Sequence, residues 1–276
     1  MDNFKSEVEL TLEEMQKLAE FLKKHIGIYL DEDKIRRFKK KIELLMLKHH
    51  ITSFSSFYHR IRFAKDEVLL QDLINSVTVN ETYFWREHQQ FEILANEILP
   101  ALAKQKKDIR ILVAPTSSGE EVYSIMFAIL EEANVIEHTN IEIVGIDIDS
   151  NMIRKAQVGL YSQRSLEKLP KEMLKKYFTK VGAYYQIDDM FKQNAKFLQA
   201  NIFDEELPQK LKTFDIVFSR NMLIYFDKKE KEKVFNVFYE LLYPQGYLFL
   251  GHADANGIDK MKFAPVKSGF HIYRKI

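Results

Sequence analysis

The chain has 276 residues, 46% of them hydrophobic, which is enough for one large domain or two smaller ones with packed cores. Its 41 basic and 40 acidic residues leave a formal net charge of +1, so no overall field attracts nucleic acid or an anionic membrane. The absence of cysteine excludes disulfides, thiolate zinc sites and cysteine nucleophiles. There is no secretory signal pattern at the start, and no apolar run approaches the roughly 18 residues of a membrane span. A soluble cytoplasmic protein without membrane insertion is expected.

The first part of the sequence predicts helices. Residues 11–26 begin with Thr11 and Glu14 at capping-box spacing and precede Gly27. Residues 34–48 predict a helix with one apolar face, and its other face carries Arg36, Arg37, Lys39, Lys40 and Lys41. Because helical patterns continue to about residue 77 without any strand pattern, we expect an all-helical domain over residues 1–75.

Beyond residue 108 the pattern changes to short apolar runs that alternate with helical stretches. These runs are RILVA (110–114), IEIVGI (141–146) and FDIVFS (214–219). Such alternation predicts an α/β domain over residues 76–276, with a parallel sheet covered by helices. Residues 184–203 resemble short antiparallel strands, which predicts a small inserted antiparallel β-subdomain at about 180–200. The last residues, 263–275, contain a Ser-Gly turn and predict a hairpin.

The segment VAPTSSGEEVYS, residues 113–124, reads as a strand, a glycine turn and a helix, which is a usual phosphate-binding arrangement. Only Gly119 is present, however, where a dinucleotide site has G-x-G-x-x-G. Glu120 and Glu121 follow it, and each would repel a nearby phosphate charge by on the order of 1 to 4 kcal/mol. A cationic, phosphate-free ligand such as S-adenosylmethionine would instead be attracted. The alternative, that the two glutamates only complement the helix dipole, remains open at this point.

Two further candidate residues lie at the ends of strands of the predicted sheet. Asp147 ends the second strand, where an acidic side chain accepts hydrogen bonds from ribose hydroxyls in dinucleotide and adenosylmethionine sites. Asn201 follows residues 195–200, and its amide is a candidate for reading the adenine edge. A polar residue at a strand end is also common without any ligand.

Four stretches together carry a resemblance to a known family. They are NETYFWREHQQFEIL (80–94), SSGEEVYSI (117–125), GIDIDSNMIRKAQVGLYS (145–162) and FDIVFSRNMLIYFDKKEKEKVF (214–235). Over nearly its whole length the chain resembles the chemotaxis receptor methyltransferases, the CheR family. This resemblance implies a class I S-adenosylmethionine-dependent methyltransferase sheet of Rossmann-like type, an N-terminal all-helical domain and a small inserted antiparallel β-subdomain. It also implies methyl transfer to glutamate carboxylates on the cytoplasmic helices of chemoreceptors, which adapts chemotactic signalling.

The resemblance assigns roles by matching position. Residues expected to contact the cofactor are Asn80, Thr82, Arg86, Glu121, Asp147, Asn201, Ile202, Arg220 and Asn221. Tyr225 is expected near the transferred methyl group. The sequence departs from the family pattern at Ser118, Val122 and the segment GHAD (251–254), where the family usually has threonine, proline and GHSE.

The chemistry requires little from catalytic side chains. A glutamate carboxylate has a pKa of about 4.3, so it is ionised at neutral pH and needs no general base. We therefore assign Arg86 and Tyr225 to orienting the substrate carboxylate. The alternatives are an ion pair of Arg86 with Glu87 and a core position for Tyr225.

The sequence is also compatible with other functions. A non-catalytic S-adenosylmethionine-binding signalling adaptor would share the cofactor site, and an NAD-dependent enzyme would need the missing glycines. The basic face within residues 34–48 could dock on acidic receptor helices or simply be solvated. No proline follows Asn221, which disfavours amino-group chemistry on nucleic acid. The histidine spacing predicts no metal, and no heptad pattern predicts a dimer, so a monomer is expected.

Overall fold

The structure is a computed structural model, and it describes residues 8–132 and 138–276. It contains two compact units. The first comprises the described residues up to Val79 together with Tyr225–Asp227, and the second comprises Asn80–Ile224 and Lys228–Ile276. No helix in the described ranges combines the length and the apolar character needed to cross a bilayer.

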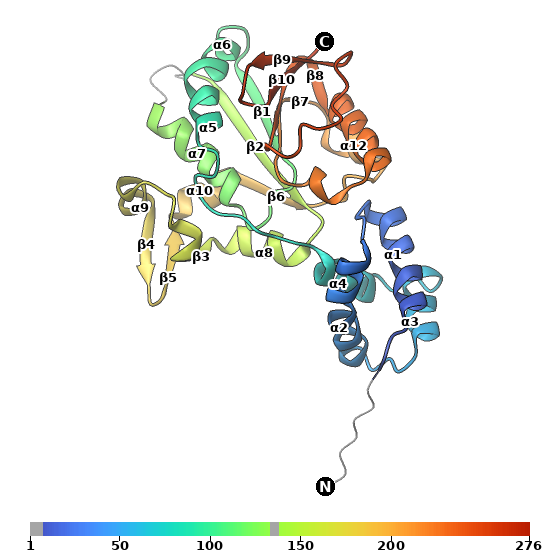
Figure 1. Cartoon of the computed structure of the whole chain (residues 1–276). Helices are drawn as coiled ribbons and strands as arrows, with labels where there is room; N and C mark the ends of the chain where they lie inside the picture. The colour runs from blue at the N-terminus through green and yellow to red at the C-terminus, as the bar shows by residue number, and fades with distance from the viewer. Residues whose placement is uncertain (1–7, 133–137) are drawn as a thin grey trace. The chain divides into compact units, whose positions relative to one another are not determined.

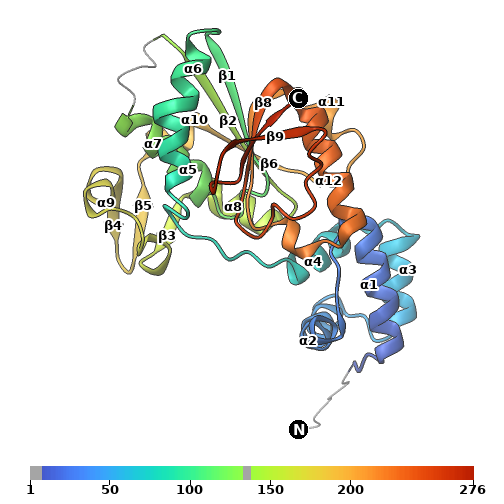
Figure 2. The same ribbon diagram turned by 45° about the horizontal axis from the view of Figure 1, so that its top comes forward.

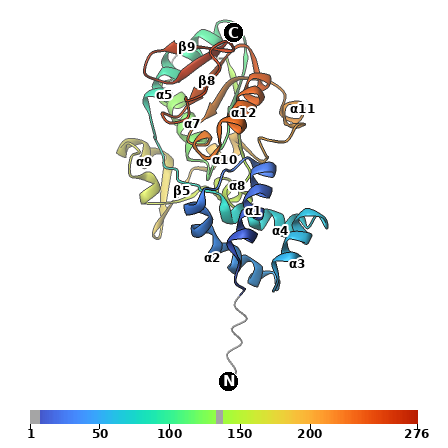
Figure 3. The same ribbon diagram turned by 45° about the vertical axis from the view of Figure 1, so that its right-hand side comes forward.

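The first unit is built on four helices, which Figure 3 shows together. They are α1 (Leu12–Ile26), α2 (Glu32–Lys48), α3 (Phe54–Arg62) and α4 (Glu67–Val77). The predicted capping box is confirmed, because the Thr11 side chain accepts from the Glu14 N–H and Glu14 accepts from the Thr11 N–H. Gly27 ends α1 with a φ of 75°, a conformation that favours glycine. The predicted apolar face of α2 is also buried.

A short segment distant in sequence completes this unit. Tyr225, Phe226 and Asp227 belong to it although the strand that precedes them, Phe214–Ser219, belongs to the second unit. The Tyr29 N–H donates to the Tyr225 carbonyl at 2.9 Å, and Lys23 pairs with Asp227 at 2.6 Å. The segment is thus anchored at the C-terminal end of α1.

The second unit is built on a seven-stranded sheet with the order β6-β2-β1-β7-β8-β10-β9. The strands are β1 (Asp108–Val113), β2 (Asn140–Asp147), β6 (Ala195–Gln199), β7 (Phe214–Ser219), β8 (Leu242–Leu250), β9 (Phe263–Lys267) and β10 (Ile272–Lys275). The first five strands in this order pair in parallel, and β10 pairs antiparallel with both β8 and β9. The predicted parallel strands and the C-terminal hairpin are confirmed.

Helices cover the sheet on both faces. They are α5 (Gln89–Ile93), the π-helix η1 (Leu94–Ile98), α6 (Leu99–Ala103), α7 (Glu120–Glu132), α8 (Ser150–Val158), α10 (Asp189–Asn194), α11 (Leu207–Leu211) and α12 (Lys228–Leu241), with the 3-10 turns η2 (Arg164–Leu166) and η3 (Leu223–Tyr225). Figures 1 and 2 show α5, α6 and α7 on one side of the sheet and α12 on the other. Every residue of β7 is buried, as expected for a central strand with both faces covered.

The small antiparallel sheet is present, but it is drawn from other residues than expected. It has the order β3-β5-β4 and consists of β3 (Leu160–Ser162), β4 (Phe178–Val181) and β5 (Tyr184–Ile187), with α9 (Lys171–Tyr177) between β3 and β4. The expectation of antiparallel strands over 184–203 is right for β5 and wrong for β6, which pairs in parallel with β2. Since β6 is a half-exposed edge strand, its alternating pattern does not reveal the direction of its partner.

Parallel pairing brings the carboxyl ends of five strands to one edge of the sheet. These ends lead into the loop after β1, Asp147 after β2, Asn201 beyond β6, Arg220 after β7 and Gly251 after β8. Strand order reverses beside β1, because β2 lies on one side of it and β7 on the other. Ligands of such sheets bind at this switch point.

Candidate cofactor-binding site

The glycine turn after β1 is held tightly against the sheet. Gly119 has a φ of 94°, and a Cβ there would lie 2.9 Å from the Cβ of Ala156. Both the backbone conformation and the lack of space therefore require glycine. The turn places α7 directly after it, with Glu120 and Glu121 in the first helical turn.

Asp147 lies beside this turn and is 5% exposed. Its Oδ2 accepts from the Ser117 N–H at 2.8 Å, and its Oδ1 accepts from the Asp149 N–H at 2.9 Å. Burial raises the pKa of Asp147 to about 6, although these two backbone bonds oppose the rise. The Ile148 N–H opposes the rise as well, so backbone donors engage most, but not all, of the four lone pairs of this carboxylate.

The two glutamates of the turn have different environments, and only one of them faces the cluster at the carboxyl ends of the strands. Glu120 is 3% exposed, and its carboxylate accepts hydrogen bonds from the hydroxyls of Ser118 and Ser165. Glu121 instead lies 3.1 Å from the Arg220 guanidinium. The Glu120 carboxylate is therefore engaged by side chains of the protein, and the assignment of Glu121 to the cofactor stays a prediction.

Glu121 has an unused acceptor in a buried position. Among the described residues, its Oε1 has no hydrogen-bond partner. Burial raises the pKa of the Glu121 carboxyl, and the positive charge of Arg220 opposes this rise. A buried carboxylate with a vacant oxygen suits a cationic group of a ligand, because such a group would supply both charge and hydrogen bonds.

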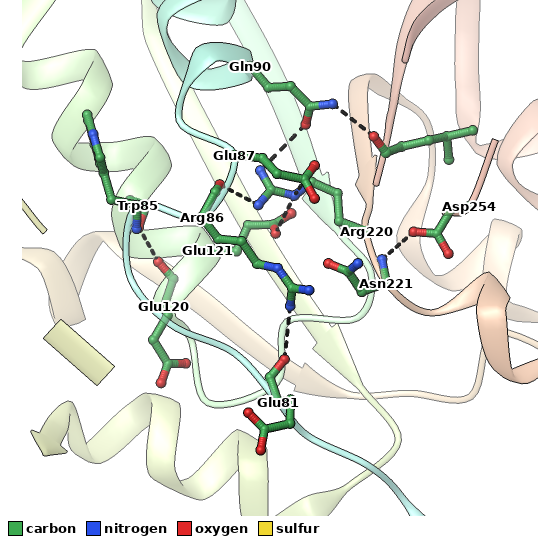
Figure 4. Close-up of polar contacts among 12 residues, drawn as sticks. Glu81, Trp85, Arg86, Glu87, Gln90, Glu120, Glu121, Arg220, Asn221 and Asp254 are labelled. Carbon is green, nitrogen blue, oxygen red and sulfur yellow. Dashed lines mark hydrogen bonds and ion pairs between the residues drawn. The ribbon is translucent and has the colours of Figure 1, made fainter. Parts of the chain in front are cut away.

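Arg220 connects the elements around Glu121, as Figure 4 shows. Its side chain is 1% exposed, donates to the Arg86 carbonyl, and lies 3.5 Å from the Gln90 Oε1. The guanidinium also lies over the Phe91 ring, 5.0 Å from its centroid, and Glu87 is 4.0 Å away. Arg220 therefore fixes the segment before α5 against the carboxyl end of β7.

Segment 80–86 is anchored by contacts at both of its ends. The Asn80 amide donates to Asp149 at 2.7 Å, and Phe84 is fully buried against the core of the second unit. Thr82 is half-buried between them. Arg86 donates from Nη1 to the Glu81 carbonyl at 3.1 Å, and its guanidinium lies over the Tyr83 ring, 5.4 Å from the centroid. Its side chain is thus bound within its own segment.

The remaining predicted residues lie at other strand ends. Asn201 accepts from the Phe203 N–H at 3.0 Å and forms a turn after β6, with Ile202 buried beside it. Asn221 follows β7 with a φ of 59°. Tyr225 belongs to the first unit, so its place relative to the other residues stays a prediction.

Three residues that support the site were not assigned a role from the sequence patterns. Gln90 is 3% exposed and donates to the carbonyls of both Leu250 and Phe270 at 2.8 Å, which locks the start of α5 to β8 and the final hairpin. Asp254 accepts from the Asn221 N–H, and Ser117 donates to Asp147. A polar residue inside an apolar helix start, as in QQFEI, was the available signal for Gln90.

Taken together, these residues fit a nucleoside that carries a positive charge and no phosphate. Asp147 ends β2, Glu121 lies in the first turn of α7, and the turn between β1 and α7 lacks the glycines that admit a pyrophosphate. Within the described ranges, no group of three or more His, Asp or Glu side chains is arranged to hold a metal ion.

Comparison with known proteins supports the same type of ligand. Residues 13–78 match the CheR methyltransferase all-alpha domain, and residues 80–270 match the CheR methyltransferase SAM binding domain. A chemotaxis protein methyltransferase 2 of Vibrio cholerae is 36% identical over 274 residues, which cover 98% of this chain and 92% of that protein. A chemotaxis protein methyltransferase of Borreliella burgdorferi is 29% identical and covers 92% of both chains. The chain therefore belongs to the CheR methyltransferase family and is an S-adenosylmethionine-dependent methyltransferase.

Proposed function

We propose that the protein methylates glutamate side-chain carboxylates on the cytoplasmic helices of chemoreceptors, and that it acts in the cytoplasm. Two observations support this assignment: membership of the CheR family and the chemotaxis names of its relatives in Vibrio cholerae and Borreliella burgdorferi. The observation on this chain that carries the substrate assignment is the exposed basic face of α2.

The cofactor S-adenosylmethionine supplies an electrophilic methyl group on a sulfonium, next to an ammonium group and a ribose. Asp147 is assigned to the ribose hydroxyls, because it is a buried acceptor at the end of β2 and its four lone pairs outnumber its backbone donors. Glu121 is assigned to the ammonium group, because its Oε1 is buried and unpartnered among the described residues. The other assigned contacts are Asn80, Thr82, Arg86, Asn201, Ile202, Arg220 and Asn221.

The substrate carboxylate needs orientation rather than activation. It is ionised at neutral pH, so the protein has no proton to remove. Alignment of reacting groups is worth roughly 7 to 11 kcal/mol in favourable cases. Arg86 and Tyr225 are assigned to this alignment. The bond from Arg86 to the Glu81 carbonyl uses one of the five guanidinium N–H groups, and the contact with Tyr83 holds the guanidinium plane.

The basic face of α2 is the proposed contact for acidic receptor helices. The helix buries Ile35, Phe38 and Ile42, and its exposed basic residues are Arg36, Arg37, Lys40 and Lys41. Exposed charges of one sign accelerate association with oppositely charged partners, and salt weakens this effect. Replacement of Arg37 and Lys40 by glutamate is expected to raise the KM for the receptor and to leave the affinity for S-adenosylhomocysteine unchanged.

A methyl-transfer assay tests the proposal. The protein is incubated with S-adenosylmethionine labelled in the methyl group and with a receptor cytoplasmic fragment, and the expected product is label that base releases as methanol. Tyr225→Phe should lower kcat more than it lowers cofactor affinity. Tyr243→Phe, at the exposed start of β8, is the matched control and should change neither quantity.

The outcomes separate the two candidate functions. Base-labile label on the receptor fragment supports the enzyme. Tight S-adenosylhomocysteine binding without any transfer to receptor fragments would instead support a signalling adaptor. Calorimetric binding of NAD in place of S-adenosylhomocysteine would contradict the cofactor assignments given above.

A further inference from the structure

We infer that Asp254 is a positioning residue for methyl transfer, because its carboxylate holds the loop after β7 in the conformation that presents Asn221. The activity part of this inference rests on the proposed function. The structural part does not, because it concerns backbone hydrogen bonds within the second unit.

Asp254 is fully buried, and only one of its two carboxyl oxygens has a hydrogen-bond partner among the described residues. The side chain has 0% exposure, and Oδ2 accepts from the Asn221 N–H. Burial raises the pKa of Asp254, and the backbone N–H groups of Asn221, Leu223 and Ile224 oppose this rise. The bond from the Asn221 N–H, drawn in Figure 4, therefore ties the chain directly after β7 to Asp254.

The loop needs such support because its conformation is uncommon. Asn221 has a φ of 59°, in the left-handed region that few residues other than glycine adopt without cost. Arg220, immediately before it, is held by Glu121 and the Arg86 carbonyl. The contacts of Arg220 hold the residue before Asn221, and Asp254 holds the Asn221 N–H. The Asn221 side chain therefore has little freedom to leave the site.

Gly251 makes this approach of the two loops possible. A Cβ at this position would lie 2.6 Å from the Asp254 Oδ2 and 3.0 Å from the Asn221 nitrogen. The Asp254 N–H also donates to the Gly251 carbonyl at 3.0 Å, which closes a turn after β8. Gly251→Ala therefore perturbs the same contact from the opposite side without removing any carboxylate.

Hydrogen exchange of the second unit tests the structural part directly. In Asp254→Asn, the amides of Asn221, Leu223 and Ile224 are expected to exchange at least ~10-fold faster than in the wild type, while the amides of β1 keep their protection. Gly251→Ala is expected to act in the same direction. If Asp254→Asn does not fold, the Gly251→Ala protein carries this test.

Steady-state kinetics test the positioning role. Asp254→Asn is expected to lower kcat ~10-fold and to weaken S-adenosylhomocysteine binding, while the KM for the receptor fragment stays within ~2-fold. Asp254→Glu keeps the carboxylate, so kcat should return to within ~3-fold of the wild type.

Asp215→Asn is the matched control. Asp215 is a buried aspartate on β7, the strand that precedes Asn221, but it lies at the amino end of that strand, where its carboxylate accepts from the Arg110 N–H at 2.9 Å. This variant should lose stability and keep its kcat. Unchanged exchange at residues 221–224 in folded Asp254→Asn would overturn the inference, as would an equal loss of kcat in Asp215→Asn. Absence of methyl transfer in the wild type would refute the proposed function alone, since the exchange result stands without it.

Discussion

Acidification should weaken cofactor binding through Asp147. Its pKa is raised to about 6 in the ligand-free protein, with burial as the main cause. Ribose hydroxyls donate to a carboxylate better than to a carboxylic acid, so binding favours the ionised form. With this pKa, Asp147 is ~90% ionised at pH 7 and ~10% ionised at pH 5. The association constant for S-adenosylhomocysteine should therefore fall ~10-fold between these values, or ~1.4 kcal/mol.

Asp147→Asn separates the contribution of Asp147 to the pH dependence of binding from the contributions of other groups. At pH 7 the variant loses hydrogen bonds to a charged acceptor, worth ~1.5 to 3 kcal/mol each, so binding should weaken at least ~10-fold. The variant should also lose most of the pH dependence between pH 5 and 7. Burial also raises the pKa of Glu121 and of Asp254, so any dependence that remains is assigned to these two carboxyl groups.

Isothermal titration calorimetry with S-adenosylhomocysteine at pH 5, 6 and 7 measures both effects. Asp188→Asn serves as the control, because Asp188 caps α10 at the amino end of β6, away from the strand ends that carry Asp147. Its binding curve should match the wild type at each pH. An identical pH dependence in the wild type and in Asp147→Asn would refute the role of the Asp147 carboxylate.

Three further changes probe the site and the fold. Glu121→Gln should weaken S-adenosylhomocysteine binding ~10-fold or more by calorimetry. Glu120→Gln should change this affinity little, because the Glu120 side chain is bound to two serines. Equal effects of the two variants would contradict the different roles given to the two glutamates. Phe84→Ala should lower the free energy of unfolding by ~3 to 5 kcal/mol in urea titrations, and Phe63→Ala, whose ring is 64% exposed, should change it little. Thr11→Ala should cost ~1 kcal/mol by the same measurement, since it removes the cap of α1.

Local signals predicted the parts of the fold that depend on neighbouring residues. The capping box and Gly27 set the ends of α1, and buried apolar runs gave the central strands. Asp147 was singled out because acids that bind ribose stand at the end of the second strand in such sheets, and β2 does end at Asp147; its role stays a prediction. The direction of β6 could not be read in this way, because pairing direction depends on the partner strand and on the crossover between them.

The site contains contacts that no local pattern reveals. Successive residues of a helix point about 100° apart, so the sequence did not indicate which of Glu120 and Glu121 faces Arg220. Gln90 contacts Arg220, which is 130 positions away in the sequence, and Asp254 binds Asn221, which is 33 positions away. Only the order of the strands brings such residues together, and the sequence predicted the class of sheet rather than its full order.

Because Tyr225–Asp227 belong to the helical unit, the two units cannot be separated by a single cut in the chain. A truncated chain that begins at residue 80 would keep Tyr225 and Asp227 but lose Tyr29 and Lys23, which bind them. A chimera that exchanges the helical unit for that of a relative would have to conserve these two contacts. Modular engineering of the enzyme should therefore treat residues 225–227 as part of the transplanted piece.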